Sequence, residues 1–279
     1  MYKLIDGSEM AKQTRIAIKK EIEKLDGTPK LVVVLVGDDP ASHVYVRNKE
    51  KFAGRVGMDS EVIRLPEETS EDELLSLVEK LNNDSSVNGI LVQFPVPKHI
   101  SSNKIMNTIS PDKDVDGLNQ INIGKLVAGV EGLTPCTPTG IIEMIKSTGI
   151  EISGKNAVVV GRSLLVGKPV AMMLLQENAT VTLCHSRTKD LAGEIKRADI
   201  VVAAVGIPNF VRGDMIKEGA VVIDVGINQV GEKLVGDVEF ETAVKKASHI
   251  TPVPRGVGPM TIAMLLNNTL LAYKAQSQK

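Results

Sequence analysis

The chain has 279 residues, of which 43% are hydrophobic and 3% aromatic, with a formal net charge of -1 at pH 7. These values are typical of a globular protein long enough for one large domain or two modest ones. A nearly neutral chain without tryptophan lacks the basic patches and stacking surfaces that nucleic-acid binding usually requires. We therefore expect no nucleic-acid partner.

Membrane and secreted classes are also disfavoured. No apolar run approaches the ~18 residues needed to span a bilayer, and residues 1–6 lack the apolar core of a signal peptide. Cys136 and Cys184 match no metal or redox spacing. We expect a cytoplasmic protein with free thiols, no membrane partner and no metal site.

Short β-branched runs alternate with amphipathic stretches, a pattern typical of parallel α/β architecture. Ser70 and Glu73 have the spacing of a capping box, which indicates a helix start. In the first half, the predicted strands are residues 31–36, 61–65 and 89–93, and the predicted helices are residues 9–25, 41–56 and 71–81.

The second half continues this alternation, after a segment rich in glycine and proline at residues 131–138. We place the domain boundary in that segment. The predicted domains are residues 1–136, joined by a C-terminal helix within residues 259–279, and residues 137–258. In the second half, the predicted strands are residues 157–160, 180–184, 200–205 and 221–225, and the predicted helices are residues 167–176, 191–196 and 260–273.

The segment from Val158 to Pro169 has the pattern of a strand, a tight turn and a helix start. Gly161 and Gly167 match the outer glycines of a Rossmann fingerprint, whereas Ser163 replaces the middle one. Glycines in such a turn allow the backbone to approach a pyrophosphate at the helix N-terminus. Alone the loop is a weak signal, because glycine at a strand–helix junction is often structural.

The end of the next strand strengthens the nucleotide hypothesis. Residues 184–189 read Cys-His-Ser-Arg-Thr-Lys, without the carboxylate that binds the ribose in NAD-binding folds. Together with Arg162, this basic segment favours the 2′-phosphate of NADP. A solvated loop that happens to be basic is the alternative. Gly206 and Gly226, at the ends of two later strands, indicate either ligand-facing loops or ordinary turns.

Three features of the first half indicate chemistry. Tyr45 and Lys49 have i, i+4 spacing, which places side-chain roots about 5–6 Å apart on one helix face. Short-chain dehydrogenases have the same Tyr-Lys spacing, but in them the pair follows the nucleotide loop. In this chain the pair precedes the loop. Gln93 ends an apolar strand, and Asp114 and Asp116 lie in a turn. Each has an ordinary alternative: a solvated lysine, a polar strand end and an Asp-Gly turn.

Several segments together resemble the bifunctional methylenetetrahydrofolate dehydrogenase/methenyltetrahydrofolate cyclohydrolase family. The resemblance covers essentially the whole chain in order. It implies two α/β domains, the second a Rossmann-type parallel sheet, with a catalytic cleft between them, folate on the first and NADP on the second. The segments that carry it are residues 42–49, 90–97, 113–117, 134–138, 161–167 and 251–261.

The resemblance also implies the site residues. Those assigned to catalysis are Lys49, its neighbour Tyr45, the strand-end Gln93 and the pterin-binding Asp116. Further residues implied to bind substrate are Ser42, Val92, Phe94, Pro254, Gly256, Val257 and Gly258. The implied NADP contacts are Thr137, Gly161, Arg162, Ser163, His185, Ser186 and Ile227.

The implied function belongs to one-carbon folate metabolism. A hydride passes from 5,10-methylenetetrahydrofolate to NADP, and water then opens the methenyl product to 10-formyltetrahydrofolate. Lys49 can move protons only if its pKa falls well below about 10.4. We expect burial and the absence of a nearby carboxylate to lower it, with Gln93 orienting the amine. Asp116 is expected to accept hydrogen bonds from the pterin.

One departure from the family concerns Arg255, which stands where glycine is usual. A side chain there restricts positive φ, so the loop is predicted to sit differently, with Arg255 reaching the anionic tail of folate. A homodimer is implied by the resemblance alone. The alternatives are a shikimate dehydrogenase-like NADP enzyme, an enzyme that has lost one activity, and a non-catalytic nucleotide-sensing or scaffold protein.

Overall fold

The computed structural model describes residues 2–277, apart from the side chains of Pro40 and Ala41. The chain forms two compact units. Unit 1 contains residues 2–11 and Thr137–Thr261, and unit 2 contains Lys12–Cys136 and residues 262–277. Residues 278–279 of the predicted C-terminal segment lie outside the described residues. Across residues 2–277, no helix combines the length and apolar character needed to cross a membrane.

Unit 1 is built on a six-stranded parallel sheet with the order β1-β11-β8-β7-β5-β6. The central strands consist largely of buried β-branched residues, which explains why they occupy the interior of the sheet. The strands are β1 (Lys3–Leu4), β5 (Asn156–Val160), β6 (Thr180–Cys184), β7 (Ile200–Ala203), β8 (Val221–Asp224) and β11 (His249–Ile250). The other elements are α6 (Cys136–Ser147), α7 (Gly167–Gln176), α8 (Leu191–Lys196), the 3-10 helix η1 (Gly213–Met215), α9 (Phe240–Ala243) and the hairpin strands β9 (Asn228–Val230) and β10 (Lys233–Val235).

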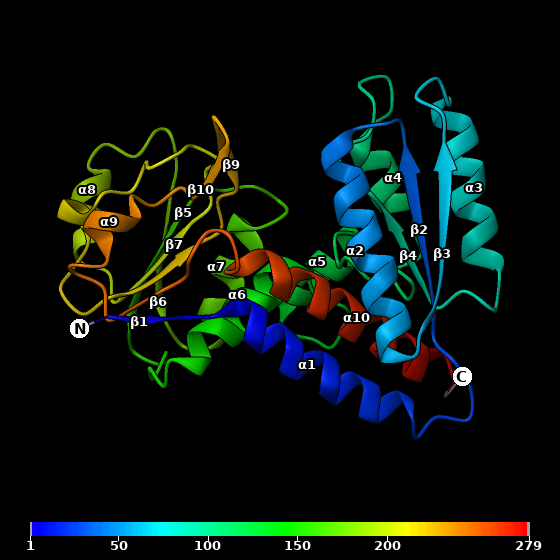
Figure 1. Cartoon of the computed structure of the whole chain (residues 1–279), viewed down its shortest axis with the longest axis horizontal. Coiled ribbons are helices and arrows are strands. Elements are labelled where there is room, and N and C mark those ends of the chain that lie inside the picture. The colour runs from blue at the N-terminus through cyan, green and yellow to red at the C-terminus, as the bar shows by residue number, and fades with distance from the viewer. Residues whose placement is uncertain (1, 278–279) are drawn as a thin grey trace. The chain divides into compact units, whose positions relative to one another are not determined.

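Unit 2 contains a three-stranded parallel sheet with the order β3-β2-β4. In Figure 1, β2 and β3 run side by side between α2 and α3. Leu74, Val78 and Leu81 of α3 are buried at helical spacing, so this helix contributes an apolar face to the core. The elements are β2 (Lys30–Val36), β3 (Asp59–Leu65), β4 (Gly89–Val92), α2 (Pro40–Val56), α3 (Glu71–Asn83), α4 (Ser102–Thr108) and α5 (Gln120–Ala128). Helices α1 (Gly7–Ile22) and α10 (Val257–Gln276) continue from unit 1 into unit 2.

The predicted fold class of two α/β units, one with a Rossmann-type parallel sheet, is confirmed. All the predicted strands and helices are present, with ends that differ by a few residues. The capping box is formed reciprocally by Ser70 and Glu73 at the start of α3.

Two features differ from the sequence prediction. Residues 2–11 belong to unit 1, because β1 pairs in parallel with β11, whereas the sequence groups them with the first domain. The glycine- and proline-rich segment at residues 131–138 contains the start of α6 at Cys136. Pro138 lies in the first turn of that helix, where its missing N–H has no helical partner to lose.

Candidate functional site

Lys49 and Gln93 meet in unit 2. Lys49 lies on α2 with its side chain buried, and Gln93 follows directly after β4. The Lys49 Nζ donates a hydrogen bond of 2.8 Å to Gln93 Oε1. The Gln93 Nε2 donates in turn to the carbonyl of Phe94 at 2.7 Å, which orients the amide with its oxygen toward the amine. The amine thus has a neutral acceptor on a rigid strand end.

Asp116 is the second charged group near Lys49. Burial, the largest influence, lowers the pKa of Lys49 below its ordinary value, and Asp116 and Cys136 raise it only in part. Burial likewise raises the pKa of Asp116, against the effects of Lys49 and Cys136. The expectation that no carboxylate lies nearby is therefore wrong. The pKa of Lys49 is lowered because burial outweighs attraction to Asp116, and each group is shifted toward its neutral form.

Cys136 and Asn268 complete this cluster, and the sequence did not predict either. The Cys136 thiol hydrogen-bonds to the Asp116 side chain and donates to the Val115 carbonyl at 3.1 Å. Burial raises the pKa of Cys136 well above its ordinary value, so the thiol is a donor. The Asn268 Nδ2 donates to the carbonyls of Val115 at 2.9 Å and Thr134 at 2.8 Å. An asparagine within the apolar pattern of α10 was the available signal.

Two further predicted residues of unit 2, Ser42 and Tyr45, lie on α2. Ser42, on the same helix as Tyr45 and Lys49, is buried, and its hydroxyl donates to Asp39 Oδ2 at 2.7 Å. Because the same oxygen also accepts from the Ser42 backbone N–H, this pair caps α2. Tyr45 is 38% exposed.

Val92 and Phe94 lie on either side of Gln93 in the chain. Val92 is buried in the hydrophobic core under the sheet, and Phe94 packs against that core. The side chain of Val92 therefore faces the core.

In unit 1, the glycine loop has the close contacts that a Rossmann turn requires. Gly161 has φ +121°, and a Cβ there would lie 2.1 Å from the Ala204 carbonyl oxygen. A Cβ on Gly167 would lie 2.0 Å from the Gly161 carbonyl oxygen. The hydroxyl of Ser163 accepts hydrogen bonds from the backbone N–H groups of Val166 and Gly167, at 3.1 and 3.3 Å. The serine therefore closes the turn as well as replacing a glycine.

Strand register brings the predicted basic segment to this loop. Val160 of β5 pairs with Cys184 of β6, so Arg162 and Ser186 each lie two positions beyond paired residues, and both are exposed. His185 closes a local turn, in which its Nδ1 accepts from the Arg187 backbone N–H at 3.1 Å. The carboxyl ends of β5 and β6 thus present the glycine turn beside a basic loop.

The remaining predicted residues of unit 1 lie on three segments. Thr137, in the first turn of α6, hydrogen-bonds with Thr261 at 2.9 Å between the hydroxyl oxygens. Ile227 follows β8 and is 48% exposed. A Cβ on Gly258 would lie 3.7 Å from the Ile227 Cδ1, so Ile227 contacts the loop of residues 254–258. Within that loop Pro254 is exposed, Val257 is buried, and Gly256 and Gly258 flank the latter.

Arg255 pairs within its own unit, and its predicted contact with folate stays a prediction. Its backbone adopts φ +83°, the left-handed region that glycine usually occupies, at a cost of about 1–3 kcal/mol. Its guanidinium pairs with the Asp6 carboxylate at 2.7 Å. The side chain therefore pairs with the segment that precedes α1.

Two family models match the chain. Residues 5–116 match the tetrahydrofolate dehydrogenase/cyclohydrolase catalytic domain, and residues 135–277 match the NAD(P)-binding domain of the same family. The first match contains Lys49, Gln93 and Asp116, and the second contains the glycine loop.

Known proteins of this family are similar along their whole length. The bifunctional protein FolD of Moorella thermoacetica is 58% identical, over 97% of this chain and 98% of its own. The crystal structure of the bifunctional FolD dehydrogenase/cyclohydrolase from Campylobacter jejuni has a TM-score of 0.96 and 47% identity, covering 99% of each chain. The Trypanosoma brucei dehydrogenase-cyclohydrolase, solved with NADP cofactor and inhibitor, has a TM-score of 0.95 and 39% identity, covering 100% of this chain and 99% of its own.

Solved shikimate dehydrogenases are much more distant. The Aquifex aeolicus enzyme is 17% identical with a TM-score of 0.51, covering 91% of this chain and 95% of its own. This likeness shows the fold alone.

Proposed function

We propose, because the chain belongs to the tetrahydrofolate dehydrogenase/cyclohydrolase family, that it oxidises 5,10-methylenetetrahydrofolate with NADP and hydrolyses the methenyl product to 10-formyltetrahydrofolate. The observation that carries the hydrolytic half is the hydrogen bond between the buried Lys49 amine and Gln93, with Asp116 nearby. A lysine whose pKa is lowered by burial is a group that can accept and return a proton near neutral pH.

The hydrolysis follows from that arrangement. Water attacks the methenyl carbon, a C–O bond forms, and the neutral amine of Lys49 accepts the proton that the water releases. Lys49 then returns a proton to ring nitrogen N5 as the carbon–N5 bond breaks. The hydroxyl on the former methenyl carbon loses its proton to solvent, which leaves the formyl group on N10. Gln93 keeps the amine oriented throughout without adding charge, and Asp116 accepts hydrogen bonds from the pterin.

The residues of unit 1 fit NADP. The turn at Gly161 and Gly167 has no room for side chains, which gives the tight turn and the close helix–strand packing of a dinucleotide-binding fold. Arg162 and Ser186 lie in register at adjacent strand ends without a carboxylate in residues 184–189, as a 2′-phosphate requires. NADP, when bound, supplies the acceptor for the hydride. The NADP complex of the Trypanosoma brucei relative supports this choice.

A spectrophotometric assay tests both activities. The protein is mixed with methylenetetrahydrofolate and NADP, and absorbance follows NADPH and the methenyl species. An enzyme with only the dehydrogenase activity would accumulate methenyl product, and a non-catalytic protein would give no NADPH.

The role of Lys49 is tested by Lys49→Met, which preserves length and removes the amine. We expect cyclohydrolase activity to be abolished while NADP binding persists. Lys51→Met, which changes an exposed lysine of the same helix, is the matched control and is expected to resemble the unmodified protein. Full hydrolysis of methenyltetrahydrofolate by Lys49→Met would overturn the assignment.

We further propose a cytoplasmic homodimer that acts in one-carbon metabolism and binds neither nucleic acid nor membrane. The family resemblance and the nearly neutral net charge support this proposal. Sedimentation equilibrium at micromolar protein concentration measures the oligomeric state, and a monomer would contradict the dimer.

A further inference from the structure

Asp237 is a fully buried carboxylate. Its link to the predicted site residues is indirect: it hydrogen-bonds to Asn228, which follows Ile227 in the chain. One oxygen, Oδ2, accepts hydrogen bonds from the backbone N–H groups of Val205 at 2.6 Å and Gly206 at 2.9 Å. The other, Oδ1, accepts from the Ile207 backbone N–H at 3.0 Å and from the Asn228 Nδ2 at 2.9 Å. A single side chain thus binds the loop after β7 to Asn228, the first residue of β9, which directly follows the loop after β8.

Asp237 is itself held firmly. Its backbone N–H donates to the buried Asp224 Oδ1 at 2.8 Å, and its carbonyl accepts from the Val211 backbone N–H at 2.9 Å. A Cβ on Gly226 would lie 2.2 Å from Asp237 Oδ1, and one on Gly236 would lie 1.8 Å from Asp224 Oδ2. The backbone at Gly226 and Gly236 therefore packs against the two carboxylates and leaves no room for a side chain.

The two loops that Asp237 joins each carry an exposed isoleucine. Ile207 and Ile227 are both 48% exposed, so part of each side chain is accessible to a ligand. Both loops follow the carboxyl ends of parallel strands, which is where ligands bind in open α/β sheets. Oδ1 of Asp237 holds the backbone of Ile207 and the side chain of Asn228, next to Ile227.

We propose that Asp237 is a positioning residue for the dinucleotide, holding Ile207 and Ile227 in place to receive an apolar ring face of the cofactor. This inference rests on the proposed function and adds to it Ile207 as a contact and Asp237 as the group that places it. Asp237 acts through the loops and does not touch the cofactor. Loops that are ordered before binding need not be ordered by the ligand, which increases affinity.

Asp237→Asn is the sharpest test because it keeps the size and shape of the side chain. Each carboxylate oxygen accepts two hydrogen bonds, whereas an amide nitrogen only donates. Whichever oxygen becomes nitrogen, two N–H groups lose their acceptor. We expect the dissociation constant of NADPH, measured by its fluorescence, and the KM for NADP to rise about tenfold, equivalent to about 1.4 kcal/mol. The dehydrogenase kcat at saturating NADP is expected to stay nearly unchanged.

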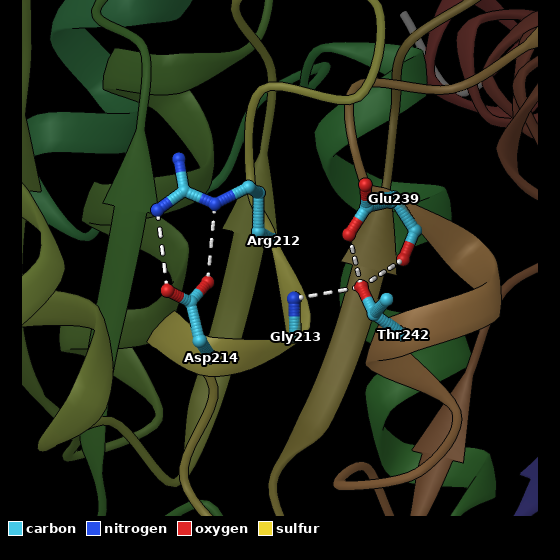
Figure 2. A network of polar contacts seen from close by, with 5 residues as sticks. All are labelled: Arg212, Gly213, Asp214, Glu239 and Thr242. Atoms are coloured by element: carbon cyan, nitrogen blue, oxygen red, sulfur yellow. Dashed lines mark hydrogen bonds and ion pairs between the residues drawn. The ribbon is translucent and has the colours of Figure 1, made fainter.

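Asp214→Asn is the matched control in the same unit. Figure 2 shows the Asp214 carboxylate paired with Arg212, beside the hydrogen bond from the Gly213 backbone N–H to Thr242. Its side chain is 69% exposed, so we expect no change in NADP affinity. Cyclohydrolase activity with methenyltetrahydrofolate, which needs no NADP, is measured for every variant as a check on folding and is expected to be unchanged.

Asn228→Ala carries the test if Asp237→Asn does not fold. It removes one of the four hydrogen bonds to Asp237 from a partly exposed position, and we expect the KM for NADP to rise about threefold. Unaltered NADP affinity in whichever of these two variants folds would overturn the role of Asp237. If the unmodified protein failed to bind NADPH, the proposed function would fail instead, so the two failures are distinguishable.

Discussion

The surroundings of Lys49 and of Asp237 represent two ways to bury an ionisable side chain. Lys49 donates one described hydrogen bond, to the neutral oxygen of Gln93, and burial lowers its pKa despite Asp116. Asp237 accepts four hydrogen bonds, two on each carboxylate oxygen. A buried amine with few fixed partners is shifted toward its neutral form, whereas a carboxylate that accepts hydrogen bonds on both oxygens holds the geometry of its partners. The first arrangement suits proton transfer, and the second suits a scaffold.

Gln93→Glu would remove the difference between the two sites, because it gives Lys49 a charged partner of almost the same shape as the neutral glutamine. An adjacent carboxylate changes the pKa of its neighbour by about 1 to 3, in this case upward for the lysine. Less of the amine is then neutral near pH 7. We expect cyclohydrolase kcat at that pH to fall at least about tenfold and to recover as pH rises through the new pKa of Lys49, as a pH–rate profile would show.

Gln93→Met separates charge from orientation in the same experiment. It removes the acceptor without adding a carboxylate, so the loss of activity should show no recovery at alkaline pH. If Gln93→Glu had the same pH profile as Gln93→Met, the neutral amine would not be the reactive form of Lys49.

The sequence predicts the residues around Lys49 better than those around Asp237, and the reason is physical. Lys49 and Gln93 have side chains that contact each other, and helical spacing and a polar strand end already mark them as unusual. Asp237 instead binds backbone N–H groups about thirty positions earlier in the chain, with a sequence separation of 32 for Val205. Backbone partners have no residue signature, so Gly236-Asp237 has the pattern of an ordinary turn.

The same distinction applies to the fold. The strands β2, β5, β7 and β8 are runs of buried β-branched residues that local pattern suffices to predict. Strand β1 has two residues, both exposed, and exists because it pairs with β11, nearly the whole chain length away. Short edge strands depend on such distant partners, which periodicity within a window does not detect.

Asp224, which binds the backbone of Asp237, is expected to make the stability of the protein depend on pH. Burial, with a smaller contribution from Asp237, raises its pKa from an ordinary 3.8 to about 6. The folded protein therefore binds this proton more tightly than the unfolded chain. The contribution of Asp224 to the free energy of unfolding is fully present below pH 3.8 and is lost as pH rises through about 6. The contribution differs by about 3 kcal/mol between these two limits.

Asp224→Asn removes that titration. We expect the stability of the variant, relative to the unmodified protein, to increase by about 2–3 kcal/mol as pH rises across this window, measured by urea unfolding at several pH values. Asp199→Asn is a control of opposite sign. Burial of Asp199 is outweighed by its hydrogen bonds to Lys217 and Asn156, so its pKa is lowered. A parallel pH dependence for the two variants would contradict this account.

Arg255 extends the comparison to the surface, where the expected effect is smallest. Its ion pair with Asp6 is exposed on both sides and is worth about 0–1 kcal/mol, while its φ of +83° is unfavourable for any side chain. Arg255→Gly removes the pair and relieves the strain, and it gives the unfolded chain more freedom. We expect the free energy of unfolding to change by less than about 1 kcal/mol, with an unchanged KM for folate.

Arg255→Ala loses the pair but keeps the strain, and should be less stable than Arg255→Gly by about 1 kcal/mol. Thermal unfolding of the two variants side by side measures this difference, and an alanine variant more stable than the glycine variant would show that the left-handed backbone carries no strain at this position.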